Sequence, residues 1–160
     1  MPKESATPKD PGSPAAMGPD EWEALAAFRR ELRRFLRFSE DAARSHGVTP
    51  QQHQLLLAIK GTPGRDWATI AELAENLQLR HHSVVGIVDR SEAHCLVERS
   101  RHQDDHRSVE VRLTSTGESV LLALTTFHRQ ELERMAATWE VLGRLSRPHR
   151  GLENPTDDEP

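Results

Sequence analysis

The chain has 160 residues, of which 36% are hydrophobic and 29% charged. This length allows one domain with a modest core and excludes an enzyme with large, separate substrate and cofactor domains. The formal net charge is -4, from 21 Lys and Arg against 25 Asp and Glu. Residues 151–160 contain four of these acids and no base, so residues 1–150 are formally neutral. The acidity therefore belongs to a terminal segment and does not exclude a nucleic-acid partner.

Cysteine content and hydropathy indicate a cytoplasmic protein. Cys95 is the single cysteine, which excludes a disulfide within the chain and fits a reducing compartment. The longest apolar runs, 55–59 and 120–124, fall far short of the roughly 20 residues that cross a bilayer. The polar, proline-rich start of the chain does not have the pattern of a secretory signal.

Two terminal segments are predicted to be disordered. Residues 1–19 contain five prolines among polar residues, a composition that buries too little apolar surface to fold. Residues 147–160 combine prolines with the acidic cluster and are predicted to be an acidic disordered tail.

The first predicted helix runs from about Asp20 to His46 because apolar residues recur there every three or four positions. Its other face carries arginines: Arg29, Arg30, Arg33, Arg34 and Arg37. Gly47 is expected to end it in a left-handed conformation. We assign residues 20–48 to dimerisation.

Capping patterns predict the next helices. Thr49 with Gln52 is a capping box that opens a helix to about Lys60, and the Gly61–Gly64 stretch ends it. Thr69 with Glu72 opens a short third helix. Residues 80–93 form a fourth helix with an apolar stripe and a polar surface, so the last two helices indicate a helix-turn-helix.

Beyond residue 95 the hydrophobic period changes from 3.6 to 2. The segments 96–101 and 109–113 predict a β-hairpin with a charged tip. Ser115 with Glu118 is expected to cap a last helix with coiled-coil spacing, about 45 Å long if unbroken. We assign residues 115–146 to dimerisation and 49–114 to a DNA-binding lobe. The predicted fold is mainly α with a small β-wing, a winged helix-turn-helix.

A recognition helix needs donors for base edges and one buried stripe, and residues 80–93 have both. Gly86 has two interpretations, close approach of a phosphate or base, or an undemanding exposed site. The residues predicted to face the major groove are Arg80, His81, His82, Ser83, Gly86 and Arg90.

The hairpin tip has a second candidate contact. Asp105 is positioned to orient Arg107 in a narrow minor groove, with His106 beside them. Taken alone, the same residues are more typical of a solvated turn with a weak ion pair, but after a helix-turn-helix the DNA contact is favoured.

Residues 49–122 resemble the MarR family of dimeric winged-helix transcription factors. The resemblance rests on "VTPQQHQLLLAI", "IAELAENLQLRHHSVVGIVDRSEAHCLVERS" and "DDHRSVEVRLTSTGE", and with flanking helices it covers about residues 20–145. It implies a homodimer that binds pseudo-palindromic DNA, with interleaved terminal helices. Many members are repressors released by small aromatic acids, and others respond to thiol oxidation or metals.

Four positions depart from the family pattern. Arg80 replaces a usual serine cap, so this helix either starts loosely or exchanges its cap for a phosphate contact. Cys95 occupies a usual turn glycine, where a left-handed backbone strains a side chain. Ser91 replaces a usual leucine, which softens the packing, and His106 replaces a usual wing arginine.

The family's ligand pocket lies between the dimerisation helices and the DNA-binding lobe. Aromatic or polarisable side chains on those helices are candidate ligand contacts, although such spacing is more typical of core: Trp22, Phe28, Phe35, Phe38, His53 and Phe127. Arg33 or Arg37 is a candidate partner for a ligand carboxylate.

Other sensor chemistry has weaker support. His128 is more typical of a hydrogen-bonded core or interface residue than of a ligand, and Cys95 of an inert turn residue than of a redox sensor. The remaining histidines do not form a metal motif, and no cofactor is expected.

The sequence therefore predicts a MarR-like dimeric DNA-binding regulator of transcription, a repressor released by a small ligand, and not an enzyme, because no catalytic constellation is recognised. The alternative is a winged-helix protein-interaction module without DNA binding. It is motivated by residues 80–112, which hold six arginines and six acids.

Overall fold

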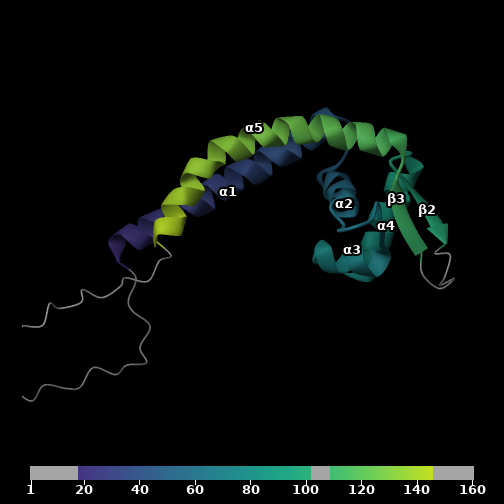
Figure 1. Cartoon of the computed structure of the whole chain (residues 1–160), viewed down its shortest axis with the longest axis horizontal. Coiled ribbons are helices and arrows are strands. Elements are labelled where there is room, and N and C mark those ends of the chain that lie inside the picture. Colours follow the sequence, from purple (N-terminus) through teal and green to yellow (C-terminus); the bar gives the residue numbers. More distant parts are fainter. Residues whose placement is uncertain (1–17, 102–108, 146–160) are drawn as a thin grey trace, which may run out of the picture.

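The computed structural model describes residues 18–101 and 109–145, with side chains except at 101 and 137–145. Two long helices, α1 (Pro19–Ser45) and α5 (Ser115–Leu145), run antiparallel and together form a curved pair, here called the arch (Figure 1). A smaller lobe lies at one end of the arch (Figure 1). The lobe contains α2 (Pro50–Lys60), α3 (Ile70–Asn76), α4 (His81–Ala93) and a small sheet. This arrangement confirms the predicted winged helix-turn-helix.

The sheet has three antiparallel strands among the described residues. They are β1 (Trp67–Thr69), β2 (Val97–Arg101) and β3 (Val109–Leu113), in the order β1-β3-β2. Val111 of the central strand pairs with Ala68 on one side and Arg99 on the other. The hairpin of β2 and β3 was predicted, whereas β1 was missed because three residues are too few to show a period.

The helix starts confirm two of the three predicted capping boxes. Thr49 Oγ1 accepts a hydrogen bond from Gln52 N at 3.2 Å, and Gln52 Oε1 accepts one from Thr49 N at 2.9 Å. Thr69 and Glu72 exchange equivalent bonds at the start of α3. Gly47, with φ of 77°, has the left-handed conformation expected after α1.

The capping box predicted for Ser115 and Glu118 is wrong. Gly117 N donates to Thr114 Oγ1 at 3.1 Å, so Thr114 is the capping residue of α5. Glu118 instead accepts a hydrogen bond from Lys60 at 2.7 Å and ties α5 to the end of α2.

One apolar core holds the lobe together and reaches into α5. Its fully or nearly fully buried side chains come from α2, α3, α4, the sheet and the first turns of α5: Leu55, Leu56, Ile59, Ala68, Leu73, Val84, Ile87, Val88, Leu96, Val97, Val111, Leu121 and Leu124. Because Leu121 and Leu124 of α5 belong to this core, the arch and the lobe are packed against each other. Within the described ranges, no helix combines the length and apolar character needed to span a membrane.

Candidate DNA-binding surface and ligand cavity

Helix α4 buries one stripe and presents the other to solvent. Val84, Ile87 and Val88 are buried in the core. The side chains of His81 and His82 at the start of α4 are exposed. Arg90, near its end, is also exposed. The predicted groove-facing residues thus share the outer surface of α4 and of the turn before it, with Ser83 and Gly86 partly exposed.

The start of α4 is uncapped by any side chain. Arg80 is the N-cap residue, with φ of -69° and ψ of 145°, and its side chain makes no capping hydrogen bond. The first backbone N–H groups of a helix have no partner within the helix and form its positive end. Since the N-cap side chain leaves them free, this helix end suits an anion such as a phosphate.

Ion pairs explain how a formally neutral lobe presents positive charge. Arg99 of β2 bonds Asp89 at 2.5 Å and Glu92 at 2.6 Å, so two acids of α4 are held by the sheet. Within the part of the chain that the structure describes, Arg80 and Arg90 form no ion pair. The outer surface of α4 therefore keeps its positive charge although the lobe as a whole is balanced.

A second ion-pair group lies on the sheet away from α4. Arg112 of β3 bonds Asp66 at 2.7 Å and Glu110 at 2.8 Å. These pairs were not predicted, because the sequence shows the charges but not which strand brings them together.

Gly86 is not required by the fold. An added Cβ would meet the Arg90 Nη1 atom at 3.4 Å, which is ordinary contact. Both interpretations of this glycine therefore stay open until DNA binding is tested.

Two departures from the family pattern have visible consequences. Cys95, exposed in the turn between α4 and β2, has φ of 55°, the left-handed backbone expected there. Ser91 is fully buried, and its hydroxyl lacks a hydrogen-bond partner within the described chain.

The wing tip lies outside the described residues, so Asp105, His106 and Arg107 remain predicted contacts. The strands on either side of residues 102–108 are paired up to Arg101 and Val109.

A cavity of about 520 Å³ opens where α2 meets the two helices of the arch. Phe35 comes from α1, and His53 and Leu57 come from α2. The remaining lining residues come from α5: Thr125, His128, Arg129, Leu132, Glu133 and Ala136. The walls are thus mostly apolar, with an arginine and a glutamate at one side.

Two histidines stand at the inner wall of this cavity. The His128 ring is held at both nitrogens, with Nδ1 2.7 Å from the Leu124 carbonyl and Nε2 2.8 Å from Ser39 Oγ. Because a carbonyl only accepts, Nδ1 donates to it, and Nε2 forms its hydrogen bond with the serine hydroxyl. The His53 ring centroid lies 4.8 Å from that of His128. His128 is thus hydrogen-bonded, as predicted, and it is half-buried at the cavity wall.

The environment of His53 favours its neutral form. Its exposed fraction is 5%. Burial, reinforced by the neighbouring His128, lowers the pKa of His53 from 6.5 to about 4. The cavity is therefore lined by a neutral imidazole near pH 7.

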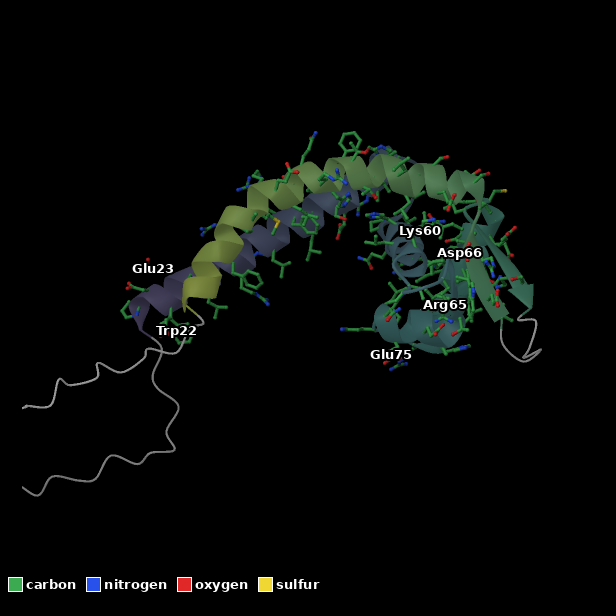
Figure 2. All side chains as sticks on the ribbon, in the orientation of Figure 1. Trp22, Glu23, Lys60, Arg65, Asp66 and Glu75 are labelled. Atoms are coloured by element: carbon green, nitrogen blue, oxygen red, sulfur yellow. The ribbon has the colours of Figure 1, made fainter. Side chains whose placement is uncertain are left out.

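Only two of the predicted ligand contacts line the cavity. Phe35 and His53 line the cavity, and the Phe38 ring lies 5.6 Å from His128, behind its wall. Phe127 packs on His46 at 5.2 Å. The remaining predicted contacts do not line the cavity: Phe28, Arg33, Arg37 and Trp22. Figure 2 shows Trp22 at the end of the arch far from the lobe.

The arginine that borders the cavity is Arg129, which the sequence analysis did not single out. Its position three residues before Leu132 of the apolar stripe of α5 was a usable signal, because residues three or four apart share a helix face.

Comparison with known proteins agrees with this geometry. Residues 46–108 match the sequence model of the MarR family. A MarR family transcription regulator of known structure is 26% identical, with a TM-score of 0.65 over 79% of this chain and 87% of the other. AbsC, a MarR family transcriptional regulator from Streptomyces coelicolor, is 19% identical, with a TM-score of 0.66 over 82% and 90%.

A mutant of MarR from E. coli, solved in complex with operator DNA, has the same fold, with 21% identity and a TM-score of 0.60 over 79% and 94% of the two chains. No curated protein sequence matches the chain. The family match covers the helix-turn-helix and the wing as far as residue 108, and the structural matches extend over 79–82% of the chain. In residues 46–108 and in its overall fold, the chain is therefore similar to the MarR family of winged-helix transcription regulators.

Proposed function

We propose that the protein is a homodimeric DNA-binding repressor that a small aromatic acid releases from its operator. The observation that carries DNA binding is the outer surface of α4, where Arg80 and Arg90 form no ion pair with any described side chain while Arg99 bonds Asp89 and Glu92. That surface adjoins an uncapped helix start, which suits phosphate.

The roles of the contact residues follow from their chemistry. Arg90 is suited to donate hydrogen bonds to O6 and N7 of a guanine. The open start of α4, together with Arg80, is suited to bind a backbone phosphate. His81, His82 and Ser83 supply further donors, and Gly86 leaves room for close approach. In the wing, Asp105 would orient Arg107 in the minor groove, with His106 beside it.

Dimerisation is supported by apolar side chains that one copy leaves exposed. On α1, Trp22 is 57%, Leu25 42% and Leu36 46% exposed, all on one face. On α5, Leu132 is 51% exposed. A second copy packed on the arch would bury this surface and place two α4 helices about one DNA turn apart.

The cavity is the proposed effector site. Its apolar walls, among them Phe35 and Leu57, suit an aromatic ring, and Arg129 at its edge suits a carboxylate. The lining residues belong to both the arch and α2. A bound ligand would therefore favour one arrangement of lobe against arch over another, which is how it would alter DNA binding.

Fluorescence anisotropy with duplexes from the region beside the protein's own gene tests DNA binding. We expect Arg90→Ala to weaken specific binding roughly 5- to 150-fold, the loss of one base contact. Arg107→Ala should lower the salt slope by about one. Arg44→Ala is the matched control, since Arg44 is an exposed arginine on α1 held by Glu40 and Asp41.

Failure to bind any duplex even at low salt, together with a stable complex with another protein, would favour the protein-interaction alternative. For the effector, thermal shift with benzoate and its hydroxylated derivatives should show stabilisation that Arg129→Ala weakens. Equal stabilisation of both proteins would place the ligand elsewhere.

A further inference from the structure

Three arginines on α1 form no ion pair among the described side chains. Arg30, Arg33 and Arg37 are exposed and spaced three and four residues apart, so they share one helix face. Among residues 18–100 and 109–136, whose side chains the structure describes, none of the three, here called the arginine row, has an ion-pair partner. Neighbouring arginines differ, since Arg34 bonds Glu31 and Arg44 bonds two acids.

The three arginines lie on the side of α1 that faces away from α5. Contacts to α5 come from Glu31 and Ser39, on a face roughly 160° around the helix from the row. The exposed apolar face that contains Trp22 and Leu36 is centred roughly 75° from the row and adjoins it, with Arg33 about 20° from Trp22. Packing against α5 therefore leaves the row open, and a second copy on the apolar face would border it at Arg33.

From this we infer that the arginine row is the docking surface for the acidic segment 151–160 of the protein's own chain. Glu153, Asp157, Asp158 and Glu159 are the only charged residues of that segment. They account for the whole formal charge of -4, because the remaining 150 residues are balanced. The segment is thus the strongest local excess of negative charge in the chain, and its four acids are opposite in charge to the three arginines of the row. The inference does not depend on DNA binding.

The geometry of the arch brings the segment within reach of the row. Ser39 bonds His128, and Glu31 bonds Arg134, so α1 and α5 run antiparallel in a fixed register. This register puts Leu145, the last residue of α5, beside the start of α1, as Figure 1 also shows.

From that level, Arg30 is about 15 Å and Arg37 about 26 Å along α1, at 1.5 Å per residue. Residues 146–152 can span up to about 23 Å when extended, so Glu153 can reach the near end of the row and residues 157–159 its far end. Residues 146–152 are therefore long enough to connect α5 to the docked segment and not much longer. A short connection keeps the effective concentration of the acids at the arginine row high.

Contacts of this kind are individually weak and depend on salt. Exposed ion pairs between long side chains gain little each, and charges farther apart than a Debye length are screened. Docking should therefore be nearly complete at low ionic strength and be lost in concentrated salt. While docked, the segment would shield the arginines from phosphate and other anions.

Paramagnetic relaxation in the full-length protein tests the inference. A nitroxide is attached at Thr156→Cys, in a chain whose native thiol is removed by Cys95→Gly, a substitution that suits φ of 55° at that turn. In about 50 mM salt we expect the amide signals around Arg33 to be broadened, and in about 1 M salt, where the Debye length is near 3 Å, to recover. Amide signals of α4 serve as the internal control.

Two triple variants separate charge from other causes. Replacing Arg30, Arg33 and Arg37 by glutamine should abolish the broadening in low salt, and replacing all three by lysine should retain it. Unchanged melting temperature and elution volume establish that both variants fold and assemble as the parent does. Broadening that is absent from α1 in low salt, or that persists in the glutamine variant, would overturn the inference.

Discussion

Stability should fall as the pH is lowered from 7.5 to 5, because of one buried imidazole. His53 is 5% exposed and lies against the ring of His128. Burial, then the neighbouring histidine, lowers the pKa of His53 from 6.5 in the unfolded chain to about 4. The unfolded state thus binds the proton more tightly, so protonation between pH 6.5 and 4 favours unfolding.

The size of the effect follows from these two pKa values. The free energy of unfolding should be unaffected by His53 at pH 7.5 and lower by about 2 kcal/mol at pH 5. The loss approaches about 3 kcal/mol near pH 4. In that lower range carboxylates interfere, among them Glu72, whose pKa is lowered by its hydrogen bond from the Thr69 backbone and by Arg65.

Urea unfolding followed by circular dichroism, at one fixed protein concentration, measures the slope between pH 7.5 and 5. His53→Gln should remove about 2 kcal/mol of the pH-dependent change, whatever its effect at pH 7.5. His82→Gln, a substitution of an exposed histidine on α4, controls for the loss of an imidazole. If the parent and His53→Gln lose equal stability over this range, His53 is not buried as a neutral group and the reasoning fails.

Three further substitutions test packing that the structure makes explicit. Gly117→Ala should lower the melting temperature by roughly 5–10 °C, because the new Cβ would lie 2.0 Å from the Leu96 carbonyl oxygen; an unchanged value would contradict that close approach. Ser91→Ala should raise stability in urea by about 1 kcal/mol, since it removes a buried hydroxyl without a partner, and a loss would point to a hidden bond. Gly86→Ala should stabilise the fold by about 1 kcal/mol. If it also weakens operator binding in anisotropy, the glycine serves DNA approach, and unchanged binding would assign it to an undemanding site.

The sequence predicted those parts of the fold that local chemistry determines. Thr49 and Thr69 cap helices because a hydroxyl followed three residues later by Gln or Glu satisfies two backbone groups at once. At the start of α5 three consecutive residues carry hydroxyl groups. Because Glu118 lies three residues after Ser115, the sequence pattern wrongly predicted Ser115 as the cap. The cap is Thr114, because Gly117 must pack against the Leu96 backbone and this fixes the register.

The candidate sites depend more on how helices cross, which spacing alone does not give. Periodicity showed that Phe35 and His128 face inward on their helices, but not that α2 meets them at a cavity with Arg129 at its edge. Trp22 has the same helical spacing as Phe35 and lies at the other end of the arch (Figure 2). Residues that share a face of a long helix can serve different partners, so aromatic content on α1 overstated the ligand site.

Net charge was the least useful guide to the candidate DNA-binding surface. The ion pairs of the lobe explain this. The balance of six arginines and six acids in residues 80–112 was the reason to consider a lobe without DNA binding. Arg99 bonds both Asp89 and Glu92, so one sheet residue takes up two acids of α4, and the arginines left on its outer surface are unpaired among the described residues. Phosphate responds to the local field within about 10 Å rather than to a total. A neutral lobe therefore offers a positive surface wherever the fold pairs its acids on another side.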